Sequence, residues 1–357
     1  MKASLDSLAE EWLLLAAAAG LLLTSVRVGR LPRPTRPELE VVFLLFALFV
    51  AVKGLENCGL VARFSRALER GRAIPLKLTL AAFFLSMLLT NDAALIVLVP
   101  LTLALDVERR DLLVILEALA ANAGSALTPF GNPQNLFLYW YYRIAPLRFL
   151  AAMAEFSLPY LILLIPAALV LVPERAVPAA PAPEPERAQP RAYVYGMLLG
   201  LAALAVLRVL PVAAAGAVFV YALAFDRRSL RVDYALLLTF LCFFGFADNV
   251  RHLLASGPQR AGSVFLASAL ASQFISNVPA ALLFAKLTTR WNALLWGANV
   301  GGFGSLAGSL ANLIAYKLYV AGKSPKARAA FTARFLGIGY AAFLFGIALY
   351  FAVGRTV

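Results

Sequence analysis

Apolar segments follow one another along almost the whole chain, and the charged residues gather in the short stretches between them. A transmembrane helix needs about 20 mainly apolar residues, and in lipid only helices and closed barrels satisfy every backbone hydrogen bond. Hydrophobic residues make up 62% of the 357 positions and charged residues only 14%, whereas soluble domains have about 45–50% and about 25%. This pattern predicts an all-α polytopic membrane protein and excludes a soluble enzyme or a disordered chain.

The net charge of +13 does not indicate a nucleic-acid partner, because the basic residues lie in loops between apolar segments, as the positive-inside rule describes. Two cysteines and one histidine offer neither a disulfide framework nor a Cys/His metal site. An apolar segment follows Lys2, but Asp6, Glu10 and Glu11 make the leading stretch acidic. No clear small-residue cleavage site follows either, so we expect an uncleaved first helix rather than a signal peptide.

Seven apolar segments are long enough to cross a bilayer once: residues 12–26, 39–55, 147–172, 193–207, 210–225, 234–250 and 335–353. Two other segments each consist of two arms around a polar tip. Residues 74–105 have the tip Thr90–Asp92, and residues 261–288 have the tip Ser276–Val278. Because arms of about 15 residues are short for a full span, these segments predict re-entrant hairpins.

Residues 112–142 and 292–320 are interrupted by Gly, Pro and Asn, which predicts two broken transmembrane helices. The breaks resemble each other. Ala121–Gly124 aligns with Ala298–Gly301 at an offset of 177, and six of sixteen positions match without a gap, while the two tips pair at an offset of 186. Because both motif pairs occur in the same order, we interpret them as an internal repeat rather than a chance likeness of Ala and Gly.

A proline-rich segment, residues 173–192, separates an N-terminal repeat (1–172) from a C-terminal repeat (193–357) and favours a stiff polyproline-type linker. Five expected crossings lie between the two tips. An odd number places the second hairpin on the opposite face of the bilayer, so the repeats are expected to be inverted. This architecture is typical of secondary transporters, whose sites lie near the midplane where broken helices meet. The distribution of Lys and Arg favours a cytoplasmic N-terminus.

The tips and breaks contain the candidate binding residues, because non-helical backbone survives at membrane depth only where it lines protein or a watery cavity. Their hydroxyl, amide and carbonyl oxygens suit a hard cation such as Na⁺, and half-helix N-termini suit an anion. The candidates for substrate or ion binding are Thr90, Asn91, Asp92, Asn122, Gly124, Thr128, Asn132, Asn135, Ser276, Asn277, Asn299, Gly301, Ser305 and Asn312. The alternative is that the Asn and Ser residues only cap half-helices and that the glycines only allow close packing.

Two acids within apolar segments, Asp92 and Glu117, have Val278 and Leu294 as counterparts in the second half. Burying a charge in the bilayer is costly, so an acid at this depth is a functional hypothesis. The alternatives are a helix-start acid held by backbone N–H groups for Asp92 and an ion pair with a loop arginine for Glu117. Since a symmetric scaffold needs an asymmetric element to distinguish the coupling ion from the substrate, we interpret both acids as coupling candidates.

In these motifs the chain resembles the ion transporter superfamily. The paired tips, the Ala-Asn-x-Gly breaks and the string Thr-Pro-Phe-Gly-Asn-Pro-Gln-Asn at 128–135 look most like the citrate-transporter-like group. That group includes arsenite permeases and one class of Na⁺/H⁺ antiporter, and divalent-anion/sodium symporters are more distant. The resemblance implies a scaffold domain, a moving transport domain and a homodimer. It also implies Na⁺ and substrate contacts at both tips, from Thr90, Asn91, Ser276 and Asn277. Asp92 and Val278 depart from the Ser-Asn-Thr tips of the dicarboxylate carriers, so di- and tricarboxylate transport does not follow.

We therefore expect a secondary active transporter of a small inorganic or organic anion, coupled to Na⁺ or H⁺, in the plasma (inner) membrane of a bacterium or archaeon. The alternatives are a Na⁺/H⁺ antiporter or an arsenite-type efflux permease. A channel and a membrane-embedded enzyme are more remote, since no nucleophile–base set, metal cluster or P-loop is present in the sequence. The expected partners are the small ion and the lipid bilayer, with no cofactor other than Na⁺ as a coupling ion.

Overall fold

The computed structural model describes residues 12–59, 68, 72–172, 177–178, 190–254 and 260–353. Nearly all of these residues are helical, so the all-α prediction is confirmed for this part of the chain. The helices of the N-terminal half are α2 (Trp12–Val28), α3 (Arg36–Asn57), α5 (Ile74–Leu88), α6 (Asn91–Ala104), α7 (Arg110–Ser125), α8 (Pro133–Tyr141) and α9 (Pro146–Leu171). The helices of the C-terminal half are α10 (Arg191–Val206), η1 (Val212–Ala215), α11 (Gly216–Phe225), η2 (Arg227–Leu230), α12 (Tyr234–Leu253), α13 (Ala261–Ile275), α14 (Asn277–Ala285), α15 (Trp291–Val300), η3 (Leu306–Gly308), α16 (Leu310–Val320) and α17 (Pro325–Val353).

The helix boundaries agree closely with the sequence pattern. Helices α5 and α6 meet at Thr90, and α13 and α14 meet at Ser276, so each expected hairpin consists of two helices around its polar tip. The expected breaks separate α7 from α8 and α15 from α16. Two short strands, β1 (Leu105–Asp106) and β2 (Val177–Pro178), form an antiparallel pair. Most of the expected linker, 173–192, lies outside the described residues.

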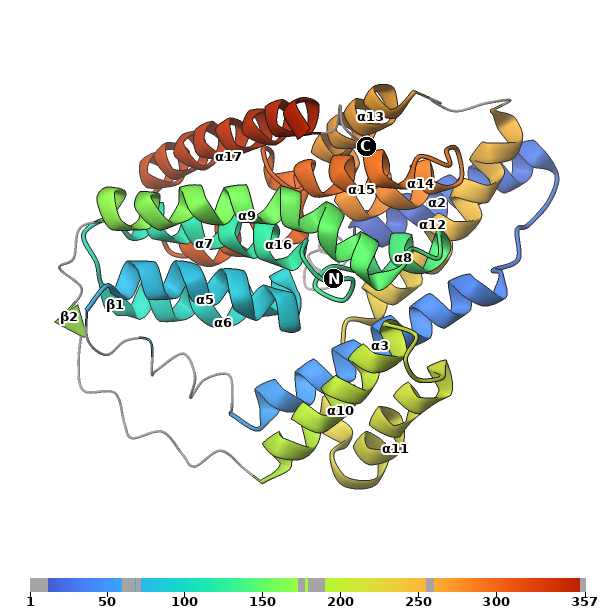
Figure 1. Cartoon of the computed structure of the whole chain (residues 1–357), viewed down its shortest axis with the longest axis horizontal. Coiled ribbons are helices and arrows are strands. Elements are labelled where there is room, and N and C mark those ends of the chain that lie inside the picture. The colour runs from blue at the N-terminus through green and yellow to red at the C-terminus, as the bar shows by residue number, and fades with distance from the viewer. Residues whose placement is uncertain are drawn as a thin grey trace.

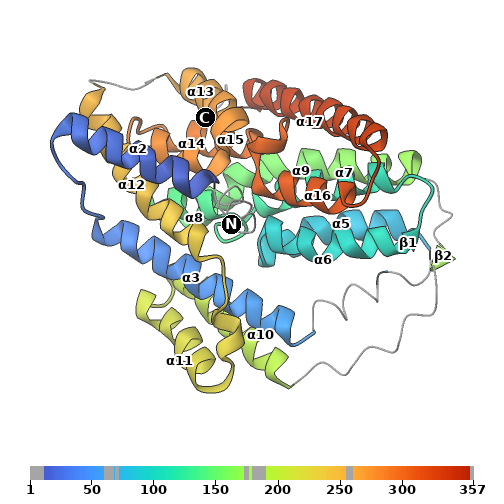
Figure 2. The ribbon, with the colours of Figure 1, turned by 180° about the vertical axis from the view of Figure 1, so that it is seen from behind.

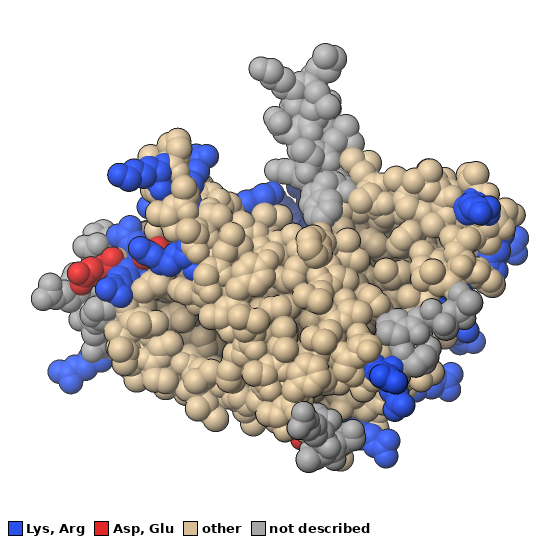
Figure 3. Space-filling model, turned by 90° about the horizontal axis from the view of Figure 1, so that it is seen from above, with Lys and Arg blue, Asp and Glu red and all other residues tan. Residues whose placement is uncertain are grey.

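The surface of the described chain fits a membrane environment. Three helical segments are long and apolar enough to cross a bilayer: Pro146–Leu171, Arg227–Leu253 and Pro325–Val353. Apolar side chains on the outer helices are exposed, among them Leu23 (72%), Val170 (75%) and Leu344 (62%). Figure 3 shows a broad uncharged face with Lys and Arg gathered toward its two ends. Lipid contact explains exposed apolar area of this extent, and the chain is a multi-pass membrane protein.

The two helix pairs lie in different parts of the molecule: α5 and α6 are at one lower edge and α13 is at the upper edge of Figures 1 and 2. The α5–α6 pair packs against α7, α9 and α16, and the α13–α14 pair packs against α15, α12 and α8. Helices α3, α10 and α11 form a separate group at one side, and α12 contacts both this group and α14. The hydrophobic core is continuous through most of these contacts.

Two contacts hold helices at short or fixed distances from each other. A Cβ added at Gly124 in α7 would lie 2.0 Å from the carbonyl oxygen of Phe83 in α5, so only glycine lets these helices approach as they do. At the other side, Lys286 at the end of α14 forms an ion pair of 2.5 Å with Glu38 near the start of α3, and both side chains are buried. Glu38 also accepts a hydrogen bond of 2.7 Å from the backbone nitrogen of Thr35, so the pair is fixed to the start of α3.

Candidate functional site

The polar tips of the two helix pairs meet at one cavity of about 330 Å³. Residues at the N-terminal ends of five helices line this cavity, namely α6, α8, α12, α14 and α16. The polar and charged residues of its wall are Asn91, Asp92, Asn132, Gln134, Asp233, Thr239, Ser276, Asn277, Ser309 and Lys317. The first N–H groups of a helix have no partner within the helix and carry partial positive charge. The helix ends at the cavity therefore favour an anion, whereas the carboxylates and neutral oxygen atoms of its wall can hold a cation.

The two tips differ in backbone conformation although both begin a helix at the cavity. Thr90 is extended (φ −170°) and its hydroxyl accepts a hydrogen bond of 3.3 Å from the backbone nitrogen of Ala93. Ser276 has a φ of +72°, which is sterically unfavourable for a residue with a Cβ. Strained backbone of this kind persists where the surrounding structure fixes it, often at functional sites. The capping interpretation thus describes Thr90 well, while Ser276 has an unusual backbone that capping does not explain.

The breaks supply the other helix ends at the cavity. Asn132 precedes α8 and donates a hydrogen bond of 2.6 Å from Nδ2 to the hydroxyl of Ser125. Ser309 precedes α16, and its hydroxyl accepts hydrogen bonds from the backbone nitrogen of Ala311 (3.3 Å) and from Asn91 Nδ2 (3.3 Å). A tip of one half is therefore bonded directly to a break of the other half.

Four buried asparagines connect the two halves behind the cavity wall. Asn122 Nδ2 donates to Asn312 Oδ1 at 2.7 Å, and Asn299 Nδ2 donates to Asn135 Oδ1 at 2.8 Å. Asn122 Oδ1 also accepts from Asn91 Nδ2 at 3.2 Å, which extends the network to the first tip. Unpaired amides are costly in a membrane interior, so these bonds fix the relative positions of the breaks.

The same hydrogen bonds recur at equivalent positions of the two halves. Thr128 Oγ1 donates to the carbonyl of Met87 at 2.7 Å, and Ser305 Oγ donates to the carbonyl of Gln273 at 2.9 Å. These donors and acceptors correspond at the offsets of 177 and 186 that relate the breaks and the tips in the sequence. Each bond ties a break to the helix that leads to the tip.

The two candidate coupling acids lie in different surroundings. Asp92, in the first turn of α6, lines the cavity, and its buried Oδ1 has no hydrogen-bond partner among the described residues. Glu117 lies fully buried between α7 and α6, where its Oε1 accepts a hydrogen bond from Thr102, and it is not part of the cavity wall. The expected alternative for Glu117, an ion pair with a loop arginine, is not what the structure shows.

Several other candidates from the sequence support the site from behind. Asn122, Asn135, Asn299 and Asn312 form the buried amide network, and Thr128 and Ser305 hold the breaks. Gly124 lies in the contact with Phe83, and a Cβ at Gly301 would lie 2.4 Å from the side chain of Ser272. Close packing, the alternative interpretation, therefore accounts for both glycines.

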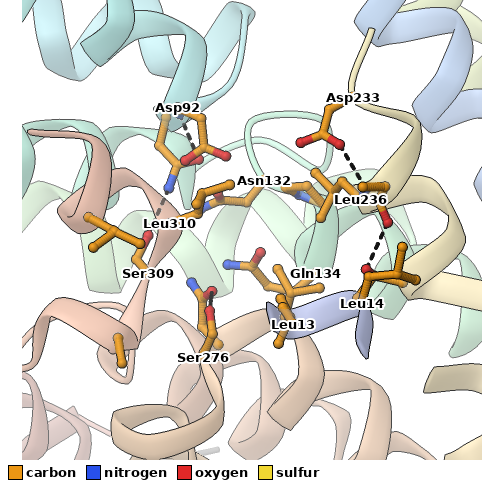
Figure 4. A pocket seen from close by; sticks show the side chains of 18 of the residues that line it. Leu13, Leu14, Asp92, Asn132, Gln134, Asp233, Leu236, Ser276, Ser309 and Leu310 are labelled. Carbon is orange, nitrogen blue, oxygen red and sulfur yellow. Dashed lines mark hydrogen bonds between the residues drawn. The ribbon is translucent and has the colours of Figure 1, made fainter. Parts of the chain in front are cut away.

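Sequence reasoning missed five polar or charged residues of the cavity wall: Gln134, Asp233, Thr239, Ser309 and Lys317. Gln134 is 0% exposed, and neither its Oε1 nor its Nε2 has a partner among the described residues. Figure 4 shows its amide inside the cavity, between Asn132 and Ser276 in that view. Gln134 belongs to the Thr-Pro-x-Gly-Asn-Pro-x-Asn string, but its position gave no sign that it faces the cavity. Asp233 and Lys317 come from helices whose proximity only the tertiary structure reveals.

A multi-pass chain whose helix ends and neutral polar side chains surround one interior cavity has the organisation of a membrane transporter, and comparisons with known proteins agree. The sequence model of the citrate transporter family matches residues 8–293. Uncharacterized transporter MJ0456 of Methanocaldococcus jannaschii is 32% identical over 296 residues, which cover 79% of this chain and 81% of that protein. Inner membrane protein YbiR of Escherichia coli is 33% identical over 314 residues, 80% of this chain and 81% of that protein. Silicon efflux transporter LSI3 of Oryza sativa subsp. japonica is 35% identical over 121 residues, 32% of this chain and 25% of that protein.

The chain belongs to the citrate transporter family, within the ion transporter superfamily.

Proposed function

We propose that the protein is a secondary active transporter of a small anion, coupled to Na⁺ or H⁺, that works by alternating access. The observation that carries this proposal is the convergence of five helix N-termini and two polar tips on one interior cavity. Helix N-termini bind anions through oriented N–H groups. Discontinuous helices with such ends are the usual substrate sites of secondary transporters.

In this proposal the two halves are inverted repeats with re-entrant hairpins, 74–105 and 261–288. The five crossings expected from the sequence between the tips favour opposite orientations, and the recurring bonds of Thr128 and Ser305 support equivalent roles for the two halves. Helices α3, α10 and α11 would then be the scaffold and dimer side, with the hairpins and breaks as the moving part. The N-terminus is proposed to face the cytoplasm.

The tip residues are proposed to bind the ions. The oxygen atoms of Thr90, Asn91, Ser276 and Asn277 suit Na⁺, which prefers oxygen ligands. Asn132, Gln134 and Ser309 supply hydrogen-bonding groups for the substrate. No resident cofactor is part of the proposal.

The charge of the cavity limits the substrate. Asp92 and Asp233 oppose an anion, so the cargo enters with a neutralising cation, with a proton, or as an uncharged species. Asp92 is accordingly the first candidate for coupling, because protonation or a bound cation removes its repulsion. Glu117, which lies off the cavity, is the second candidate, and Glu117→Gln tests it.

The test is transport into proteoliposomes that contain the purified protein, with an imposed Na⁺ or pH gradient. Citrate, silicic acid and arsenite are the first compounds to screen, because the family description, a relative's name and the resemblance point to them. A thermal-shift screen in detergent, with and without Na⁺, selects the ligands. We expect saturable flux that follows one of the gradients. Flux that does not saturate and ignores both gradients would identify a channel instead.

A second candidate function is Na⁺/H⁺ antiport or arsenite-type efflux. The observation that favours it is the presence of two carboxylates, Asp92 and Asp233, on one cavity. Proton release from the vesicle lumen on addition of Na⁺, with no added anion, distinguishes this function from anion symport.

A further inference from the structure

Asp233 occupies an unusual position for an exposed helix cap. It precedes α12, a helix outside both hairpins and both breaks, and its Oδ1 accepts a hydrogen bond of 2.9 Å from the backbone nitrogen of Leu236. It also lines the 330 Å³ cavity and a second, adjacent cavity of about 250 Å³. Because Asp233 is exposed, it lies where these cavities reach the surface of the protein.

The two cavities share part of their walls. The residues common to both are Asp92, Pro133, Asp233, Leu236 and Leu310. Two carboxylates are thus the charged groups of an otherwise apolar boundary. Figure 4 shows them on opposite sides of the cavity, with each carboxylate turned toward the other. Asp233 also lies within electrostatic reach of Asp92.

Among the described residues, the walls of the two cavities together carry three carboxylates and three cations, but the shared boundary carries only carboxylates, those of Asp92 and Asp233. Lys317 is the other charged residue of the first cavity, against two carboxylates. The second cavity adds Glu56, Lys53 and Arg231. Lys53 and Glu56 pair with each other at 2.9 Å, so Lys317 and Arg231 are the cations left, and both lie outside the shared boundary. A boundary whose charged groups are all of one sign, between low-dielectric walls, concentrates the counter-ion, here a cation.

The first cavity also shows independent signs of a ligand. Gln134 is fully buried there with both side-chain polar atoms unpartnered among the described residues, and the buried Oδ1 of Asp92 is likewise unpartnered. Buried polar groups nearly always have a hydrogen-bond partner, so we expect a ligand or water to bond to these atoms.

We propose that Asp233 is the entry residue for the coupling cation. A monovalent cation is drawn to the boundary between the two cavities by the field of Asp233 and then neutralises Asp92. This inference rests on the proposed transport function and adds to it a residue from the start of α12 and a route through the second cavity. Asp233 is a positioning residue for the cation, and its charge rather than its capping bond is what matters.

The test separates charge from capping. Asp233→Asn and Asp233→Ser remove the charge but retain a good N-cap, whereas Asp233→Glu retains the charge. The measurement is the Na⁺ concentration that gives half-maximal thermal stabilisation of the purified protein in detergent, with choline chloride as the balancing salt. We expect the first two variants to raise this concentration about 3- to 10-fold, the effect of one charge at a few ångströms in a partly wet site. The difference should shrink as choline chloride screens the field.

Three comparisons decide the outcome. Asp233→Glu should respond to Na⁺ like the unaltered protein, and Asp92→Asn should abolish the response. Asp226 carries a carboxylate but lines neither cavity, so Asp226→Asn should leave the Na⁺ response unchanged. An unaltered response in both Asp233→Asn and Asp233→Ser would reduce Asp233 to a helix cap and overturn the inference. The inference would also be overturned if Na⁺ stabilised the unaltered protein no more than choline does. Neither result bears on the proposed function, which fails if the unaltered protein shows no saturable, gradient-driven flux in proteoliposomes.

Discussion

Replacing Gly124 with alanine tests how closely the site depends on the contact between α5 and α7. The new Cβ would lie 2.0 Å from the carbonyl oxygen and 2.8 Å from the Cα of Phe83, whereas ordinary contacts begin at 3.4 Å. Because these neighbours are backbone atoms of a helix, no side chain can turn away. The two helices must separate by about 1.4 Å at this point.

The expected loss of stability in Gly124→Ala follows from this geometry. Overpacking of this kind costs about 1–3 kcal/mol, and the usual gain of about 0.4–1 kcal/mol from Gly→Ala in a helix offsets only part of it. Helix α5 leads to the tip at Thr90, so its displacement also moves the cavity wall. A misplacement of about 1 Å can reduce a rate about 100-fold, and we expect transport to fall more than stability.

Gly200→Ala is the matched control, because Gly200 also lies in a helix, α10, and its added Cβ would have no neighbour within 4 Å. Unfolding of both variants is followed by circular dichroism during titration of mixed micelles with sodium dodecyl sulfate, and flux is measured in proteoliposomes. Equal stability and equal flux for the two variants would refute the packing argument.

Three further predictions concern the tips and the buried charges. Asn91→Ala and Asn277→Ala should each abolish transport while circular dichroism stays unchanged, because each removes a neutral oxygen ligand from the cavity; normal flux in both variants would leave the tips as caps. Asp92→Asn should keep the fold and some ligand-induced stabilisation but lose the Na⁺ or pH dependence of flux, and unchanged profiles would remove it from coupling. Lys286→Met should lower the free energy of unfolding by about 3–5 kcal/mol, because Glu38 is left buried without its cation. Adding Glu38→Gln should restore most of this stability. Equal losses of stability in the single and double variants would contradict the ion-pair argument.

Much of the fold could be predicted from the sequence because the two signals involved are local. Apolar length fixes each helix, and proline, glycine or asparagine marks each interruption, as in the helix boundaries around Thr90 and Ser276. The sequence offset between the halves also predicts which residues make equivalent contacts. The hydrogen bonds donated by Thr128 and Ser305, which are related by this offset, are an example.

The charged part of the site could not be predicted in the same way. Asp233 is an ordinary N-cap in the sequence, and only the tertiary structure, in which the starts of α12 and α6 line one cavity, brings it near Asp92. Glu117 shows the opposite case, since a buried acid in an apolar segment turned out to contact Thr102 rather than the cavity. Local patterns identify which residues are unusual, but long-range packing decides which of them meet.

The reciprocal asparagine bonds have a consequence for how the protein is made. Asn122 and Asn135 are synthesised long before Asn299 and Asn312, yet each early amide bonds to a late one. Chains fold from the N-terminal side during synthesis, so the first half enters the membrane with polar groups whose partners do not yet exist. Lipid cannot replace those partners. The N-terminal half is therefore an incomplete unit until the last quarter of the chain has been inserted, and the two halves produced as separate fragments would assemble only if both were present in the bilayer together.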